Sequence, residues 1–166
     1  MKLSILIPVY NERTVVERSL GHVLAAPLPE MMERELIVVD DCSTDGTRDV
    51  VHGFGDPRIR YHRNPRNLGA HANWNQVLRL ARGRFIALLT DDDRMLPENL
   101  ARKVAVLAAH PSVGLVHSKY HVLDGQGRLV RRDTNWGHGP DRAADAVQPG
   151  AEVLAQMLLS YNRVNL

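Results

Sequence analysis

Three adjacent carboxylates, Asp91, Asp92 and Asp93, directly follow the apolar segment 84–90. Their mutual repulsion disfavours having all three ionised unless a cation compensates. Mg²⁺ or Mn²⁺ would suit this place, because these hard ions prefer carboxylate and phosphate oxygens and leave coordination positions for water and a diphosphate. The alternative is a solvated acidic loop that caps the next helix, whose N-terminal dipole would favour Asp93. The triplet alone leaves both interpretations open.

A second acidic pair, Asp40 and Asp41, ends the apolar segment 35–40. An ionised carboxylate only accepts hydrogen bonds, so this pair could bind a ribose hydroxyl or a base N–H. Taken alone, the pair is more typical of a helix cap, with Ser43 and Thr44 in the same turn. Cys42, between these groups, is predicted to be a small packed residue and not a nucleophile.

The turn Asn67–Gly69 precedes another helical segment. Its glycine could let a ligand approach the main chain, and the amide of Asn67 could read a base edge. An ordinary turn and helix cap is the commoner role of an Asn-x-Gly sequence. Both interpretations of this motif, a ligand-binding turn and an ordinary helix cap, therefore stay open.

The elements that would position these groups can be read from apolar spacing. Short apolar segments bounded by turn residues predict strands buried on both faces, at 3–9, 35–40 and 84–90. A weaker and more polar strand at 59–63 is predicted to lie near an edge of the sheet.

Helical spacing of apolar residues predicts the intervening helices. One covers 12–25 with Asn11 as its cap, and a second carries Val50 and Val51 behind a cap at Ser43, Thr44 or Asp45. Two more cover 70–82 and, beginning near Pro97, continue to about Ala109.

This alternation predicts an α/β fold with a mostly parallel central sheet between two helical layers, a Rossmann-like three-layer sandwich. Ligands of such sheets bind beyond the carboxyl ends of the strands. Both acidic clusters follow strands, so we expect them at that edge. Later in the chain, a hairpin is predicted around 124–127, followed by a polar segment at 133–150 and a helix at 151–161.

The composition sets broad limits. The 166 residues, 44% of them hydrophobic, predict one compact domain, and 21 basic against 19 acidic residues give a net charge of only +2 without a basic run. No nucleic-acid partner is therefore expected. A single cysteine excludes an internal disulfide and favours the cytoplasm. The pattern predicts neither a signal peptide nor a spanning helix, so we expect at most peripheral membrane contact.

Four segments in one order make the pattern specific: LSILIPVYNE at 3–12, LIVVDDCSTDGT at 36–47, NPRNLGAHANWNQ at 64–76 and RFIALLTDDDRMLPENL at 84–100. Together they resemble the inverting family 2 glycosyltransferases of the GT-A fold, closely so from Leu3 to Leu107. The resemblance implies that 1–166 is a single, incomplete GT-A domain. Residues 1–110 would bind the nucleotide, and residues 111–166 would begin the acceptor side.

The resemblance also implies a site. The acid cluster matches the DxD element of the family, with Asp91 meeting the ribose and Asp92 the metal in one register, and Asp93 following the metal position in another. The metal would be Mg²⁺ or Mn²⁺, bound by Asp92 and Asp93. The nucleotide-sugar-binding residues carried over by position are Pro8, Tyr10, Glu12, Asp40, Asp41, Asn67 and Asp91.

The implied reaction moves a sugar from a nucleotide diphosphate to an acceptor hydroxyl with inversion. UDP-sugars are the commonest donors of such enzymes, and a saccharide or another hydroxyl compound would be the acceptor. The general base is expected beyond Leu166, so this chain by itself is expected to bind nucleotide without transferring sugar. The kinship suggests work at the inner face of the cell membrane and is compatible with a homodimer.

Three rival functions share features of this pattern. A nicotinamide-dependent oxidoreductase needs a glycine-rich turn after the first strand, whereas no glycine occurs here before Gly21. A sugar-phosphate nucleotidyltransferase would share the metal and nucleotide sites, but its glycine-rich, basic N-terminal loop is missing. A domain that binds nucleotide without catalysis remains the third alternative.

Overall fold

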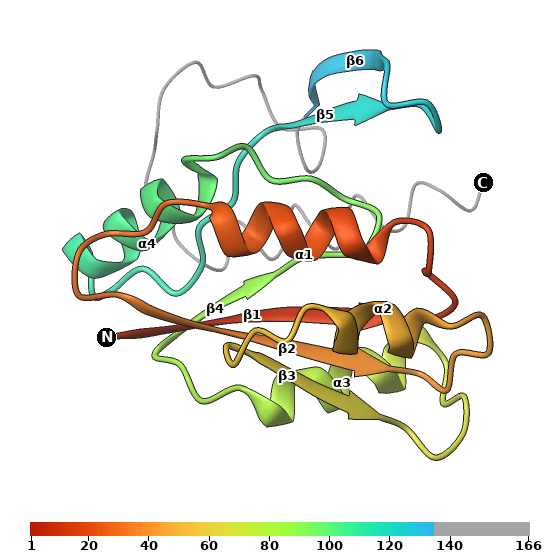
Figure 1. Cartoon of the computed structure of the whole chain (residues 1–166). Coiled ribbons are helices and arrows are strands. Elements are labelled where there is room, and N and C mark those ends of the chain that lie inside the picture. The colour runs from red at the N-terminus through yellow and green to blue at the C-terminus, as the bar shows by residue number, and fades with distance from the viewer. Residues whose placement is uncertain (135–166) are drawn as a thin grey trace, which may run out of the picture. The chain divides into compact units, whose positions relative to one another are not determined.

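The structure, a computed structural model, describes residues 1–134 (Figure 1). The chain divides into two compact units, Met1–Ala105 and Val106–Leu166. The predicted site residues all belong to the first unit, so that unit carries most of the description.

A four-stranded parallel sheet forms the centre of the first unit. Its strands are β1 (Lys2–Val9), β2 (Glu33–Asp40), β3 (Ile59–Arg63) and β4 (Phe85–Leu88). They lie in the order β3-β2-β1-β4, and each neighbouring pair is parallel. The predicted parallel sheet is confirmed, and β3 lies at an edge as its polar sequence indicated.

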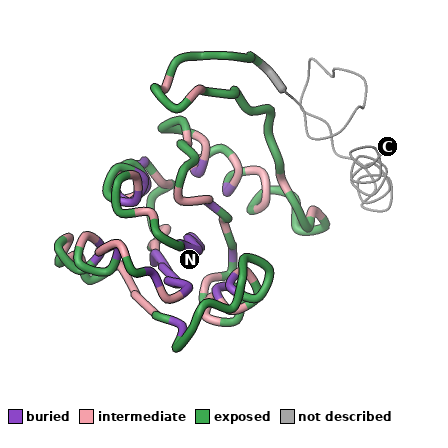
Figure 2. The backbone as a smooth tube through the Cα atoms, turned by 90° about the vertical axis from the view of Figure 1, so that its right-hand side faces the viewer, coloured by how far each residue is buried: buried purple, intermediate pink, exposed green. Residues whose placement is uncertain are grey.

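Helices cover both faces of this sheet. Helix α3 (Ala70–Leu80) packs on β1 and β2, where Val77 joins a buried cluster with Leu6, Ile37 and Val39. Helices α1 (Val16–Ala25) and α2 (Thr47–Gly53) contact each other and lie on the opposite face (Figure 1). The predicted three layers are therefore present. Figure 2 shows the buried residues gathered along the strands and the inward sides of these helices.

Strand β4 departs from the prediction of burial on both faces. Ile86 and Leu88 keep 47% and 46% of their surface exposed, and they point to the same face because strand side chains alternate. The prediction of burial on both faces is therefore wrong for β4, the last strand of the described sheet, because this face of the strand keeps about half of its side-chain surface uncovered.

The helix starts also differ from the sequence-based expectation. Helix α1 begins at Val16, and its N-cap is Val15, so Asn11 is not its cap. Helix α2 begins at Thr47 behind Gly46, which has a φ of 91°. None of the three predicted residues is therefore the N-cap, although Asp45, just before Gly46, accepts the main-chain N–H of Thr47 on its Oδ1 at 3.0 Å.

Helix α4 (Asn99–Ala109) starts two residues after Pro97 and buries Leu100 and Val104. In the second unit, β5 (Tyr120–Leu123) and β6 (Leu129–Thr134) form the predicted antiparallel hairpin. The helix predicted at 151–161 and most of the polar segment at 133–150 lie outside the described residues. None of the helices within residues 1–134 combines the length and hydrophobicity that crossing a bilayer requires.

Candidate functional site at the carboxyl edge of the sheet

The loops that follow β1 and β2 emerge side by side. Val9 and Asp40 are paired in the sheet, and the N–H of Asp41 donates to the carbonyl of Val9 at 2.9 Å. Because parallel strands place their carboxyl ends at one edge, Tyr10 leaves the sheet next to Asp41. The sheet register thus brings two of the predicted segments together.

Side-chain hydrogen bonds join these two loops. The N–H of Asn11 donates to Ser43 Oγ at 2.8 Å, and the N–H of Thr44 donates to Asn11 Oδ1 at 2.9 Å. The N–H of Glu12 donates to Thr47 Oγ1 at 2.9 Å. The polar residues that the sequence suggested as helix caps therefore bind the neighbouring loop instead.

Glu12 and the acid cluster after β4 influence one another electrostatically. Burial raises the pKa of the Asp91 carboxyl to about 6, with the charges of Glu12 and Asp92 as further causes. Burial also raises the pKa of Glu12, and the charges of Asp92 and Asp45 add to this effect. Three of the predicted site carboxylates thus lie near enough to one another at this edge to repel electrostatically.

The loop that carries the acids is held by two short contacts. Ser19 of α1 donates its hydroxyl to the carbonyl of Asp91 at 2.5 Å. The hydroxyl of Thr90 donates to Asp93 Oδ2 at 2.5 Å, which turns the Asp93 carboxylate back toward the strand end. Asp92 is exposed, and no residue in the described part of the chain donates a hydrogen bond to its carboxylate. Asp92 is therefore the open acceptor of the cluster.

This donor set fits a hard divalent cation. Carboxylate oxygens are the ligands that Mg²⁺ and Mn²⁺ prefer, and a cation would relieve the repulsion among Glu12, Asp91 and Asp92. Within residues 1–134 no group of three or more His, Cys, Asp or Glu side chains is arranged to hold a metal by itself. The fit is thus to an ion that takes one or two protein carboxylates and completes its shell with ligand oxygens.

Asp40 is fully buried and already hydrogen-bonded. Its Oδ1 accepts the N–H of Ser43 at 2.7 Å, and its Oδ2 accepts the hydroxyl of Tyr61 at 2.5 Å. Arg63 Nε lies 3.7 Å from the same Oδ2. Burial and the hydrogen bond to Asp40 both raise the pKa of the Tyr61 hydroxyl, so it remains a donor.

Asp41 is 2% exposed and holds the third loop of the site. Its Oδ1 accepts Asn64 Nδ2 and the N–H of Leu68, and its Oδ2 accepts the N–H of Gly69, each at 2.8 Å. Asn64 Nδ2 also donates to Asn73 Oδ1 at 3.0 Å. The two buried asparagines were missed from the sequence, where nothing distinguishes them from surface amides.

The remaining predicted residues differ in exposure. Pro8 is buried within β1, in register with Val39 of β2. Tyr10 is 47% exposed. Asn67 is exposed, and its Oδ1 accepts the N–H of Gly69 at 2.9 Å, as expected of a turn asparagine. The structure therefore leaves Tyr10, Asn67 and Asp92 open to a ligand, whereas Pro8, Asp40 and Asp41 lie beneath the surface.

Comparison with known proteins identifies the family of the chain. Residues 4–162 match the model of the family described as glycosyl transferase family 2. A curated relative from Escherichia coli is named UDP-Glc:alpha-D-GlcNAc-diphosphoundecaprenol beta-1,3-glucosyltransferase WfgD. It is 31% identical over 122 residues, which are 74% of this chain and 47% of WfgD.

Two solved structures resemble the fold. The mannosyltransferase PcManGT from Pyrobaculum calidifontis, in complex with GDP-Man and Mn²⁺, superposes with a TM-score of 0.61 at 28% identity over 68% of this chain and 33% of its own. TarS 1–349 from S. aureus, in complex with UDP-GlcNAc, gives a TM-score of 0.62 at 25% identity over 74% of this chain and 40% of its own.

The expected GT-A type of α/β fold is thereby confirmed. The chain spans less than half the length of the first curated relatives it matches, between 40% and 49%. The family model nevertheless covers nearly all of the sequence, from the first strand onward. The chain belongs to glycosyl transferase family 2.

Proposed function

We propose that this chain is the donor-binding region of a glycosyltransferase that transfers a sugar from a nucleotide diphosphate to an acceptor hydroxyl. The observation that supports it best is the exposed Asp92 at the carboxyl edge of the sheet, near enough to Glu12 and Asp91 for the three charges to repel one another. A cation would relieve this repulsion, and a diphosphate would complete the coordination of that cation. Family membership makes a sugar nucleotide the natural source of the diphosphate.

The open residues and the neighbouring acids each receive a role in this proposal. Asp92, with Asp93 beside it, binds Mg²⁺ or Mn²⁺, and Asp91 receives the ribose. Tyr10, Glu12 and Asn67 line the nucleotide. When bound, the metal stabilises the negative charge that grows on the departing diphosphate.

The buried residues act through the loops. Because Asp40 and Asp41 already hold main-chain N–H groups of the loops that carry the ligand, we assign them to shaping the base site from below. Pro8 likewise contributes from within β1. We propose uracil as the nucleobase of the donor, because the name of WfgD includes UDP-Glc and TarS was solved with UDP-GlcNAc.

The proposed chemistry is a direct displacement. The acceptor oxygen forms a bond to the anomeric carbon while the bond from that carbon to the diphosphate oxygen breaks, so the configuration inverts. The acceptor proton passes to a general base.

The acceptor class follows from a relative. The name of WfgD includes a diphosphoundecaprenol-linked sugar, which is a lipid-linked saccharide. We propose a growing saccharide of this kind as the acceptor here. The reaction would then take place in the cytoplasm at the inner face of the membrane, where the domain needs only peripheral contact.

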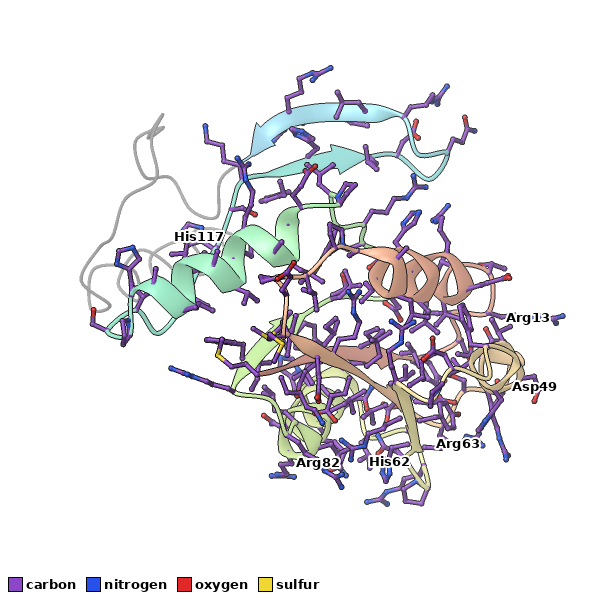
Figure 3. The ribbon with its side chains drawn as sticks, turned by 60° about the vertical axis from the view of Figure 1, so that its left-hand side comes forward. Arg13, Asp49, His62, Arg63, Arg82 and His117 are labelled. Atoms are coloured by element: carbon purple, nitrogen blue, oxygen red, sulfur yellow. The ribbon has the colours of Figure 1, made fainter. Side chains whose placement is uncertain are left out.

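Calorimetric titration tests the donor site. UDP, GDP and dTDP are titrated into the full chain with Mn²⁺ and again with EDTA. We expect UDP to bind only with the metal, and Asp92→Ala to weaken binding by at least about tenfold. Asp49→Ala is the matched control, because Asp49 is an exposed acid of α2 outside the acid loop (Figure 3). Metal-independent binding, or equal loss in both variants, would contradict the proposal.

A further inference from the structure

Arg63, the last residue of β3, makes contacts that the donor site as described so far does not use. Its Nη2 donates to the carbonyl of Ser43 at 2.7 Å and lies 3.5 Å from Cys42 Sγ. Its Nε lies 3.7 Å from Asp40 Oδ2, while the side chain keeps 36% of its surface exposed. Figure 3 shows Arg63 and Arg13 toward one end of the sheet and Arg82 toward the other.

These contacts hold the loop after β2 from outside. Ser43 is bound at both of its main-chain groups, since its N–H donates to Asp40 and its carbonyl accepts from Arg63. Cys42, just before it, has a φ of 67°, a backbone conformation that residues other than glycine and asparagine rarely adopt. A residue in this conformation persists only where its surroundings fix it; Arg63 and the carbonyl of Pro65, 3.9 Å from Cys42 Sγ, are among those surroundings.

The loop held by Arg63 in turn holds the loop after β1. Ser43 Oγ accepts the N–H of Asn11, and the N–H of Thr44 donates to Asn11 Oδ1. Asn11 itself has a φ of 58°. It stands between Tyr10 and Glu12, the two residues of this loop to which we assign the nucleotide.

We propose that Arg63 is a positioning residue of the donor site, which fixes the loops after β1 and β2 as one unit without touching the ligand. The proposal rests on the proposed function, because it assigns those loops to the donor. Asp40, the buried partner of Arg63, keeps its hydrogen bonds from Ser43 and Tyr61 when the arginine is removed, so its carboxylate does not lose all its partners. The loss of Arg63 should therefore loosen the two loops far more than it lowers the melting temperature.

Amide hydrogen exchange in the nucleotide-free chain tests the structural half. We compare the wild type with Arg63→Ala, Arg63→Lys and the control Arg66→Ala, an exposed arginine in the next loop. In Arg63→Ala the N–H groups of Asn11, Glu12 and Thr44 should exchange about three- to tenfold faster. The N–H of Leu68, bound by Asp41, should stay as in the wild type, and Arg63→Lys should be intermediate because it keeps one charged donor.

Nucleotide titration with Mn²⁺ tests the functional half on the same variants. We expect Arg63→Ala to bind UDP about five- to tenfold more weakly and Arg66→Ala to bind as the wild type does. Wild-type exchange in the two loops, or faster exchange spread evenly over the sheet, would overturn the positioning role. So would unchanged UDP affinity in a variant whose loops are loosened.

A chain that binds no nucleotide at all is a separate outcome. It would remove the donor assignment proposed above. The exchange rates would still show whether Arg63 holds the two loops, because they are measured without nucleotide. The failure of the proposed function and the failure of this inference are therefore distinguishable.

Discussion

Asp91, which we assign to the ligand, carries a charge that opposes the fold. Its carboxyl is partly buried beside Glu12 and Asp92, and burial followed by these charges raises its pKa to about 6. Above that pH the carboxyl is ionised in the folded chain, and its burial and the neighbouring charges then lower the stability of the fold. The arrangement is costly without a cation and becomes favourable with one.

The first prediction concerns a substitution that removes this charge. Asp91→Asn keeps the shape of the side chain and removes its repulsion, so it should raise the melting temperature at pH 8 in EDTA by roughly 2–4 °C, which corresponds to about 1 kcal/mol. Because the pKa of the folded state lies above that of the unfolded state, the destabilisation of the wild type grows as the pH rises from about 4 to about 6. The gain should therefore shrink below pH 6.

Thermal unfolding followed by circular dichroism measures this effect. Asp49→Asn serves as the control, since it also exchanges an acid for an amide outside the acid loop; it lies in the first turn of α2, so its melting temperature should fall by no more than about 2 °C. A fall for Asp91→Asn at pH 8 that is larger than the fall of the control would show that the carboxylate stabilises the fold. The charge repulsion would then not be the dominant effect at this residue.

At the scale of elements, a polar network ties the strands together at the end of the sheet opposite the site. Glu35 Oε1 accepts the hydroxyl of Ser4 at 2.6 Å and the N–H of Arg82 at 2.9 Å, and its Oε2 pairs with Arg60 Nη1 at 3.0 Å. Burial acts to raise the pKa of Glu35, but these bonds outweigh it and hold the pKa below its usual value. The network joins β1, β2 and β3 to the turn before β4.

That turn depends on a glycine. A Cβ on Gly83 would lie 2.6 Å from the main-chain N of Ser4 and 2.8 Å from the carbonyl oxygen of Lys2, both backbone atoms that cannot move aside. We expect Gly83→Ala to lower the melting temperature by roughly 2–12 °C, because overpacking of this kind costs about 1–3 kcal/mol.

Gly21 provides the matched substitution. It lies inside α1, and a Cβ there would meet nothing within 4 Å. Gly21→Ala should raise the melting temperature slightly, because alanine favours a helix over glycine by about 0.5–1 kcal/mol. Equal changes of melting temperature in the two variants would mean that the close backbone contacts at Gly83 do not require a glycine there.

The sequence predicted the strands and missed these networks for one physical reason. Apolar runs such as 3–9 and 35–40 need only their own composition to show burial. The partners of Asp41, Arg63 and Glu35 lie on other strands and loops, so they depend on the register of the sheet. The same cause explains Asn11, which was predicted to cap α1 and instead binds Thr44 of the neighbouring loop.

At the scale of the whole molecule, the candidate donor site and the first compact unit coincide. Every residue assigned to the nucleotide or the metal lies within Met1–Ala105. The family model nevertheless continues to residue 162, and the curated relatives are more than twice as long as the segments that this chain matches. Donor binding and sugar transfer are thus expected to need different lengths of chain.

The last prediction concerns a shortened chain that should still bind the donor. A chain ending at His110, which keeps α4 with its buried Leu100 and Val104, should fold and bind UDP with Mn²⁺ within about threefold of the affinity of the full chain. The physical reason is that none of the contacts found at the site comes from beyond residue 105 within the described residues. Circular dichroism establishes folding first, and calorimetry then compares the two affinities. A folded chain of 110 residues that binds no UDP, where the full chain does, would show that residues after 110 complete the donor site.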